Sequence, residues 1–74
     1  MRYHVVTGCF EMEKNAKNFV NTLQKQNMEA VIIGRNHRGL YMVSSGDFAS
    51  KKEAVKGLRK LQKQDLSAWL FESN

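Results

Sequence analysis

The chain has 74 residues, of which 42% are apolar and 26% charged, a composition that suits one small globular domain with one modest core. Twelve lysine and arginine residues against seven acidic ones give a formal net charge of +5, which favours anionic partners. Cys9 is the only cysteine, so an intrachain disulfide and a zinc site built from several cysteines are excluded. No apolar run approaches the roughly 18 residues of a membrane span, and we expect no signal peptide because Met1 and Arg2 lead directly into a strand-like segment.

The first half of the chain predicts a strand, a helix and a second strand. Residues 3–9 read as a strand that ends near Gly8. Residues 12–27 are predicted to be helical, because Ala16, Phe19, Val20 and Leu23 recur at the spacing of a helix face that packs on a core. A second strand is predicted at residues 29–35.

The second half repeats this order after a turn. Residues 34–39, which run from Gly34 to Gly39, are rich in turn formers and predict a hairpin into a third strand at 39–46. Ser50 and Glu53 have the spacing of a capping box, which predicts a helix over 51–64. A fourth strand is predicted at 67–72.

Residues 3–33 and 41–71 repeat each other at an offset of 38. Eleven positions are identical: Tyr3/Tyr41, Val5/Val43, Gly8/Gly46, Phe10/Phe48, Lys14/Lys52, Ala16/Ala54, Leu23/Leu61, Gln24/Gln62, Lys25/Lys63, Gln26/Gln64 and Ala30/Ala68. Met28/Leu66 is a conservative pair. Self-similarity at a fixed spacing indicates one supersecondary unit used twice.

The element order β-α-β-β-α-β predicts a ferredoxin-like α+β domain over residues 1–74. Each helix has a single apolar stripe, so both helices should cover one face of a four-stranded antiparallel sheet and leave the other face open.

The repeat also separates the two faces of the sheet. Side chains alternate along a strand, and those that pack under equivalent helices should be alike in both halves. Tyr3/Tyr41, Val5/Val43, Ala30/Ala68 and Ile32/Leu70 are alike and are assigned to the core. The diverged set, with Leu40, is assigned to the open face: His4, Val6, Val31, Ile33, Leu40, Met42, Ser44, Trp69 and Phe71. Such an apolar face indicates either a ligand-binding surface or structural cover by a dimer partner or by a flanking part of a longer chain.

Two segments carry a family resemblance. Tyr3-His4-Val5-Val6-Thr7-Gly8-Cys9-Phe10 and Leu40-Tyr41-Met42-Val43-Ser44-Ser45-Gly46-Asp47-Phe48-Ala49-Ser50 each contain an aromatic residue, an alternating strand and Gly-x-Phe, followed by a helix with an early alanine. Together with Ala68-Trp69-Leu70, they resemble SPOR domains in order and spacing over residues 3–72.

The resemblance implies a non-catalytic module that binds peptidoglycan glycan strands lacking stem peptides. It also implies that the domain belongs to a larger protein of the bacterial cell envelope, on the periplasmic side, and directs it to the septum. The glycan would lie across the open face, where the indole of Trp69 can stack on a sugar ring. Arg35 and Arg38 are candidates to contact the carboxylate that loss of the peptide exposes. Neither a metal nor a cofactor is implied.

Other functions were weighed. A bare sheet face in this topology is also the architecture of RNA-binding RRM domains, but Leu40 and Met42 stand where that family stacks bases on aromatic side chains. For catalysis, no nucleophile, base and orienting group can be assembled around His4 or His37, and Cys9 is interpreted as an ordinary small strand residue. Most lysine runs such as that of the second helix are a solvated face.

Overall fold

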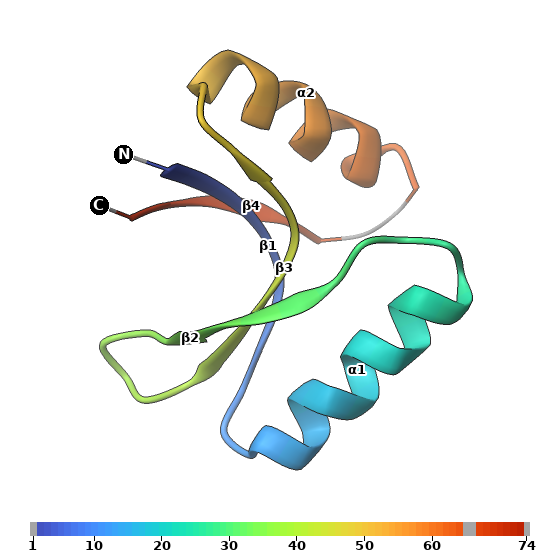
Figure 1. Ribbon diagram of the computed structural model, residues 1–74, viewed down its shortest axis with the longest axis vertical. Coiled ribbons are helices and arrows are strands. Elements are labelled where there is room, and N and C mark those ends of the chain that lie inside the picture. Colours follow the sequence, from blue (N-terminus) through green and yellow to red (C-terminus); the bar gives the residue numbers. More distant parts are fainter. Residues whose placement is uncertain (1, 65–66, 74) are drawn as a thin grey trace.

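The computed structural model describes residues 2–64 and 67–73. The elements follow one another as β1 (Arg2–Phe10), α1 (Glu13–Lys25), β2 (Val31–Arg35), β3 (Tyr41–Phe48), α2 (Lys51–Gln62) and β4 (Trp69–Ser73). The strands form one antiparallel sheet in the order β2-β3-β1-β4, with both helices on the same side (Figure 1). The predicted α+β fold and element order are confirmed. Leu66, the repeat equivalent of Met28, lies outside the described residues.

The element boundaries follow from local backbone chemistry. α1 ends in a Schellman motif, in which the Met28 N–H donates to the Leu23 carbonyl at 3.0 Å and the Asn27 N–H to the Gln24 carbonyl at 3.0 Å. Asn27 takes the left-handed conformation that this motif needs, with φ of 62°. The predicted helix end at residue 27 and strand start at residue 29 are therefore each about two residues off, a normal margin at element ends.

The predicted capping box at the start of α2 is wrong in its chemistry. The helix begins at Lys51, as expected, but the Ser50 side chain makes no capping hydrogen bond. The first turn is held by the backbone instead, where the Ala54 N–H donates to the Ser50 carbonyl at 3.1 Å. Met12 at the start of α1 also makes no side-chain cap.

The core lies between the helices and the sheet. Its centre is a buried cluster, against which partly buried side chains pack; the cluster is Ala16, Leu23, Ala30 and Val43, and the packed side chains are Phe10, Phe19, Val20, Met28, Ile32 and Tyr41. Under α2, Ala54 is buried, and a Cβ at Gly57 would meet the Phe48 ring at 3.0 Å. Gly57 therefore allows the close approach of this helix to the sheet. The face assignments of Val5, Ala30, Ile32, Tyr41 and Val43 are confirmed.

The two halves are related by an approximate twofold axis through the central strands. The partners Tyr3↔Phe48 and Phe10↔Tyr41 of β1 and β3 exchange under the offset of 38, and Val6↔Ser44 maps onto itself. Close to this axis the equivalent hydroxyls of Thr7 and Ser45 hydrogen-bond to each other at 3.1 Å. The repeat seen in the sequence is thus a repeat in space.

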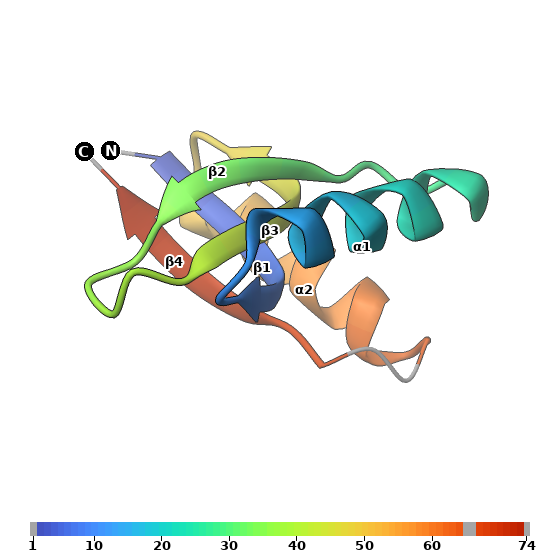
Figure 2. The ribbon, with the colours of Figure 1, turned by 90° about the horizontal axis from the view of Figure 1, so that it is seen from below.

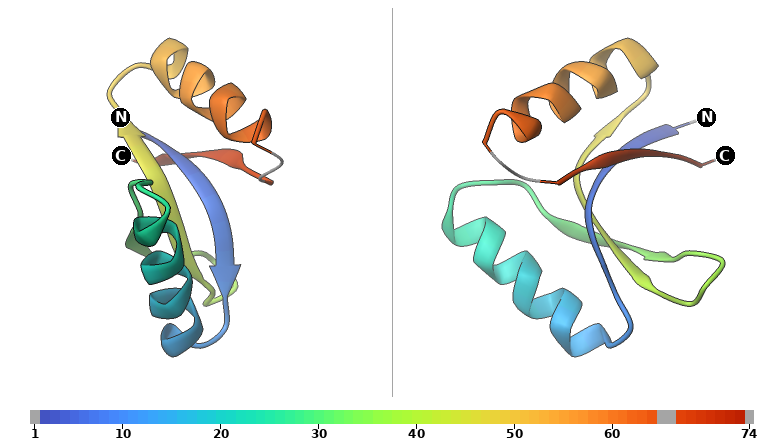
Figure 3. Two further views of the ribbon diagram at one scale, coloured as in Figure 1. Left: turned by 90° about the vertical axis from the view of Figure 1, so that its right-hand side faces the viewer. Right: turned by 180° about the vertical axis from the view of Figure 1, so that it is seen from behind.

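The sheet is strongly twisted. The register between β1 and β3 shifts twice, on either side of Val6, and such irregularities increase strand twist. Figure 2 and Figure 3 show the strands crossing at steep angles, and in Figures 1 and 2 the β2–β3 hairpin and the two chain ends project on the side away from the helices. This side is called the helix-free face below. No described helix is long and apolar enough to cross a membrane.

Candidate functional site

A row of four side chains crosses the whole helix-free face. Strand pairing places Val31 opposite Ser44, Ser44 opposite Val6, and Val6 opposite Trp69. Directly paired residues point to the same side of a sheet, and strands are about 4.8 Å apart, so the row is about 14 Å long. We call Val31, Ser44, Val6 and Trp69 the central row. Its outer and inner members are repeat equivalents, so the row obeys the approximate twofold axis.

Exposure differs sharply along the central row. Val31 and Trp69 at its ends are 52% and 43% exposed, whereas Ser44 and Val6 in the middle are 1% and 0% exposed. Ser44 and Val6 lie on the central strands, which have a neighbouring strand on both sides, whereas Val31 and Trp69 lie on the edge strands. The middle of the central row is therefore inaccessible to solvent, and its two ends are accessible apolar side chains.

The expectation that the whole diverged set is exposed is wrong for its central members. His4, Val6, Met42 and Ser44 lie on β1 and β3 as predicted, but all of them are buried. They can shape a binding surface from below, and the accessible side chains are those of the edge strands. Phe71 and Ile33 on these strands, and Leu40 just before β3, are half-buried.

His4 organises a polar cluster at one end of the helix-free face. Its Nδ1 atom is hydrogen-bonded to the Asp47 carboxylate, and its Nε2 atom lies 2.7 Å from the Ser73 hydroxyl. The Ser44 hydroxyl donates to the same carboxylate at 3.2 Å, and the Phe71 ring lies 6.1 Å from the imidazole. The sequence predicted no partners for His4, and the structure shows that this expectation was wrong. The cluster joins β1, β3 and β4.

The two candidate arginines occupy different environments. The Arg35 guanidinium lies 4.6 Å from the centre of the Tyr41 ring and donates to the Tyr41 hydroxyl. Tyr41 packs against the helix-side core, so Arg35 is held beside that ring. Arg38 is exposed in the β2–β3 turn, next to the exposed His37.

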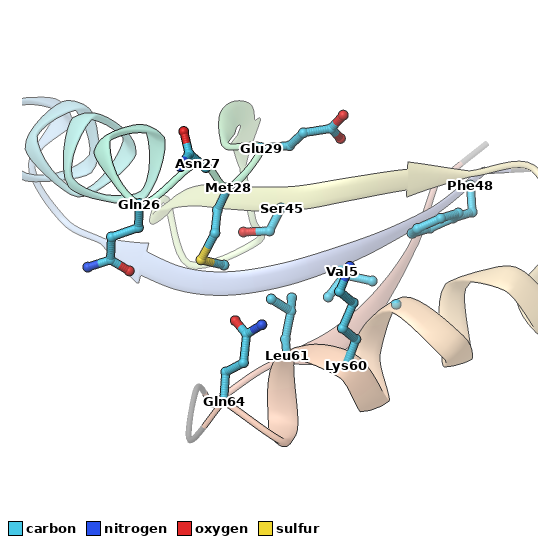
Figure 4. Close-up of a pocket in the computed structure, with 11 residues that line it drawn as sticks. Val5, Gln26, Asn27, Met28, Glu29, Ser45, Phe48, Lys60, Leu61 and Gln64 are labelled. Carbon is cyan, nitrogen blue, oxygen red and sulfur yellow. The ribbon is translucent and has the colours of Figure 1, made fainter.

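Two hollows flank this part of the sheet. One, of about 310 Å³, lies at the β2 edge of the sheet beside Val31, between Ser44 and Asp47 of β3 and Gln24 of α1. The other, of about 480 Å³, lies between the two helices on the helix side of the sheet, where Gln26 and its repeat equivalent Gln64 face it from just beyond the ends of α1 and α2 (Figure 4). The groove between the helices was not predicted, because helical periodicity fixes which face packs but not how far apart two helices lie.

The side chains at the positions where RRM domains stack RNA bases are not suited to stacking in this domain. Met42 is 3% exposed and Leu40 is half-buried. Tyr41 faces the helix-side core, as the sequence indicated. Base stacking needs accessible aromatic rings, and this part of β3 presents none. Cys9, which pairs with Met42, is half-buried, and this burial raises the pKa of its thiol.

These features define a small α+β domain with a helix-free sheet face on which an indole is accessible. A family model described as SPOR domain matches residues 2–72, and the chain belongs to this family. The peptidoglycan-binding domain of the B. subtilis cell wall lytic enzyme CwlC superposes with a TM-score of 0.74 at 25% identity, covering 97% of this chain and 90% of that one.

A second solved structure shares the fold. It is a putative exported protein of Burkholderia pseudomallei, with a TM-score of 0.68 at 15% identity. The match covers 93% of this chain but only 15% of that longer one, so it bears on the fold alone. No curated protein sequence matches the chain.

Proposed function

We propose that this domain is a non-catalytic module that binds peptidoglycan, and that it recognises glycan strands lacking stem peptides along the central row. Membership of the SPOR family and the likeness to the CwlC domain support the ligand class. The observation that carries the site is the 43% exposed indole of Trp69 at one end of the row.

The chemistry of the row suits a chain of sugar rings. An indole buries the apolar face of a sugar while its N–H remains free to donate a hydrogen bond. Val6 and Ser44 are buried, so a glycan can pass over them. The Val31 side chain, which is 52% exposed, offers a second apolar contact at the far edge of the sheet. A strand without stem peptides can approach these strands closely, because no peptide projects from its sugars.

Loss of the stem peptide leaves a carboxylate on the glycan, and the domain carries a net charge of +5. Arg38, exposed in the hairpin turn, is proposed to attract this anion. Arg35 is proposed to contribute only to the local field, because Tyr41 already holds its guanidinium.

The same reasoning gives a cellular role. The domain is proposed to be part of a bacterial envelope protein, to face the periplasm, and to direct that protein to septal wall where amidases have removed stem peptides. Family membership supports this placement.

Binding is tested by sedimentation with purified sacculi, with and without amidase pretreatment. We expect retention to rise after amidase treatment and Trp69→Ala to lower affinity about tenfold, a loss of about 1.4 kcal/mol. Trp69→Phe should keep part of the binding. Met12→Ala is the matched control, because Met12 is also exposed, at 58%, but lies outside the sheet.

Three results would contradict the proposal. Equal loss of binding in Trp69→Ala and Met12→Ala would show that the indole has no special part. Salt-sensitive binding of single-stranded RNA that exceeds binding to sacculi would assign the domain to nucleic acid. Concentration-dependent dimerisation that hides Trp69 would instead favour structural cover of the helix-free face.

A further inference from the structure

The cations of this domain are concentrated on α2. Six exposed ones lie on the helix and its C-cap: Lys51, Lys52, Lys56, Arg59, Lys60 and Lys63. Together with Glu53 they give this segment a net charge of +5, equal to that of the whole chain. At about 100° of rotation per residue, all but Lys51 fall within about 100° of arc and along about 16 Å of helix. We call Lys52, Lys56, Arg59, Lys60 and Lys63 the basic stripe.

The basic stripe is not used by the fold. The opposite side of α2, with Ala54 and Gly57, packs on the sheet. Lys60, at one margin of the stripe, is exposed and also lines the hollow between the helices (Figure 4). Within residues 2–64 and 67–73, the ion pairs are His4–Asp47 and Lys17–Glu13, and neither involves a cation of α2. The like charges of the stripe therefore repel one another, at a cost to helix stability, and Glu53 is the one acidic residue on this helix.

The internal repeat provides a comparison within the same molecule. The α1 positions equivalent to Lys56, Arg59 and Lys60 hold Asn18, Asn21 and Thr22, which are neutral and also exposed. Neutral polar residues thus satisfy the fold at these positions. Two cations of the stripe are common to both helices, since Lys52 and Lys63 correspond to Lys14 and Lys25. The other three occur on α2 alone, where packing does not require them, and this excess of charge points to a partner.

We infer that the basic stripe is a second binding surface, for a linear phosphodiester polymer without bases that runs along α2. The cations recur about once per helical turn, about every 5.4 Å, which suits a partner with one anionic group per repeat of its backbone. The inference goes beyond the proposed function, because it concerns a different surface and a different ligand.

The chemistry of the stripe decides against two other polyanions. Residues 51–64 contain no aromatic side chain, whereas binding of single-stranded nucleic acid depends on aromatic rings that stack on bases. A helix that lies in a membrane surface buries its apolar side in lipid, and here that side is covered by the sheet. A base-free polymer needs only the row of charges.

Both surfaces can be occupied together. α2 lies on the helix side of the sheet, and its outer side is directed away from the rest of the molecule (Figures 1 and 3). Trp69 belongs to the central row, whose members share the other face. A polymer on the stripe would leave the central row free.

The test is a titration with poly(glycerol phosphate) at several salt concentrations. The triple variant Lys56→Asn, Arg59→Asn, Lys60→Thr places the residues of α1 on α2. We expect this variant to bind the polymer at least tenfold more weakly at low salt. The slope of log K against log salt should become shallower by about 2, because each of the three lost contacts contributes about 0.7 to the slope for a single-stranded polyanion. The control variant, Lys14→Gln, Lys17→Gln, Lys25→Gln, removes as many charges from α1 and should change binding less than threefold.

Several outcomes would overturn the inference. One is an equal loss of polymer binding in the two triple variants. Another is binding of anionic phosphatidylglycerol vesicles, or of single-stranded DNA, that is at least as tight as binding of the polymer. A third is that the wild type does not bind the polymer. Circular dichroism and retention on sacculi show whether each variant is folded. Trp69→Ala should leave polymer binding unchanged, so failure here and failure of the proposed peptidoglycan site are distinguishable.

Discussion

Trp69 is the only tryptophan of the chain and is 43% exposed, so the intrinsic fluorescence reports directly on the proposed site. We expect emission of the free domain near that of a solvated indole and efficient quenching by acrylamide. Binding of amidase-treated glycan should shift the emission to shorter wavelength and protect it from quenching, because a stacked sugar removes water from the ring. An unchanged spectrum at saturating glycan would contradict contact with Trp69.

His4 makes a second prediction possible at this scale. His4→Leu removes the partner of both Asp47 and Ser73, and we expect a loss of about 1–3 kcal/mol in the free energy of unfolding. Urea denaturation measures it. His37, the other histidine, is exposed in the hairpin turn, so His37→Leu should change stability by less than about 0.5 kcal/mol. Similar losses in both variants would remove the structural role assigned to His4.

Cys9 allows a prediction about pH. Burial raises the pKa of its thiol, so the folded state holds less of the reactive thiolate at neutral pH than a free cysteine does. Iodoacetamide should modify the native domain more slowly than the urea-unfolded chain at pH 7.5, and the native rate should keep rising at pH values where the unfolded rate has levelled off. The folded state is favoured below the pKa of the unfolded thiol, and this contribution is lost as pH rises through the higher native value. Equal rates in the two states would contradict the burial.

Single residues also show where sequence reasoning ends. The divergence of Val31 from Trp69, and of Val6 from Ser44, groups these four side chains on one face of the sheet, and the strand pairing agrees with this grouping. Their burial could not be predicted, because it depends on the twist of the sheet and the size of cross-strand neighbours. The His4 cluster depends on a register between β1 and β3 that periodicity alone does not give.

At the scale of elements, the β2–β3 hairpin depends on glycine and asparagine. Gly34 and Gly39 have φ of 120° and 77°, in the region that favours glycine. The Asn36 side chain accepts hydrogen bonds from the N–H groups of Arg38 at 2.9 Å and Leu40 at 3.1 Å. The turn was predicted from these residue types, and its chemistry is local.

Gly39 tests this reading of the turn. Gly39→Ala should destabilise the domain by about 1 kcal/mol, because an alanine strains at positive φ. Gly39→Asn should cost less, since asparagine tolerates the left-handed region. Nothing lies within 4 Å of a Cβ at this position, so steric clash does not complicate the comparison. Equal stability of the alanine variant and wild type in urea denaturation would contradict the argument.

The helices show the same division between local and non-local information. Periodicity identified both packed stripes, and the Ser50 position was correct as the start of α2. The expected side-chain cap is absent there, because a matching pair of residue types does not fix where a hydroxyl points. The groove between the helices, with Gln26 and Gln64 on its walls, depends on how far apart the two units lie.

For the whole molecule, the approximate twofold axis has a consequence for chain connectivity. Arg2 and Ser73 are neighbours in the pairing of β1 with β4, just as β2 and β3 are neighbours at the hairpin. A circular permutant that joins residues 73 and 2 by a short turn and opens the hairpin between Arg38 and Gly39 would run β3-α2-β4-β1-α1-β2, which is again β-α-β-β-α-β. We expect such a protein to fold with a similar circular dichroism spectrum, so the order in which the duplicated halves are synthesised is exchangeable in this domain.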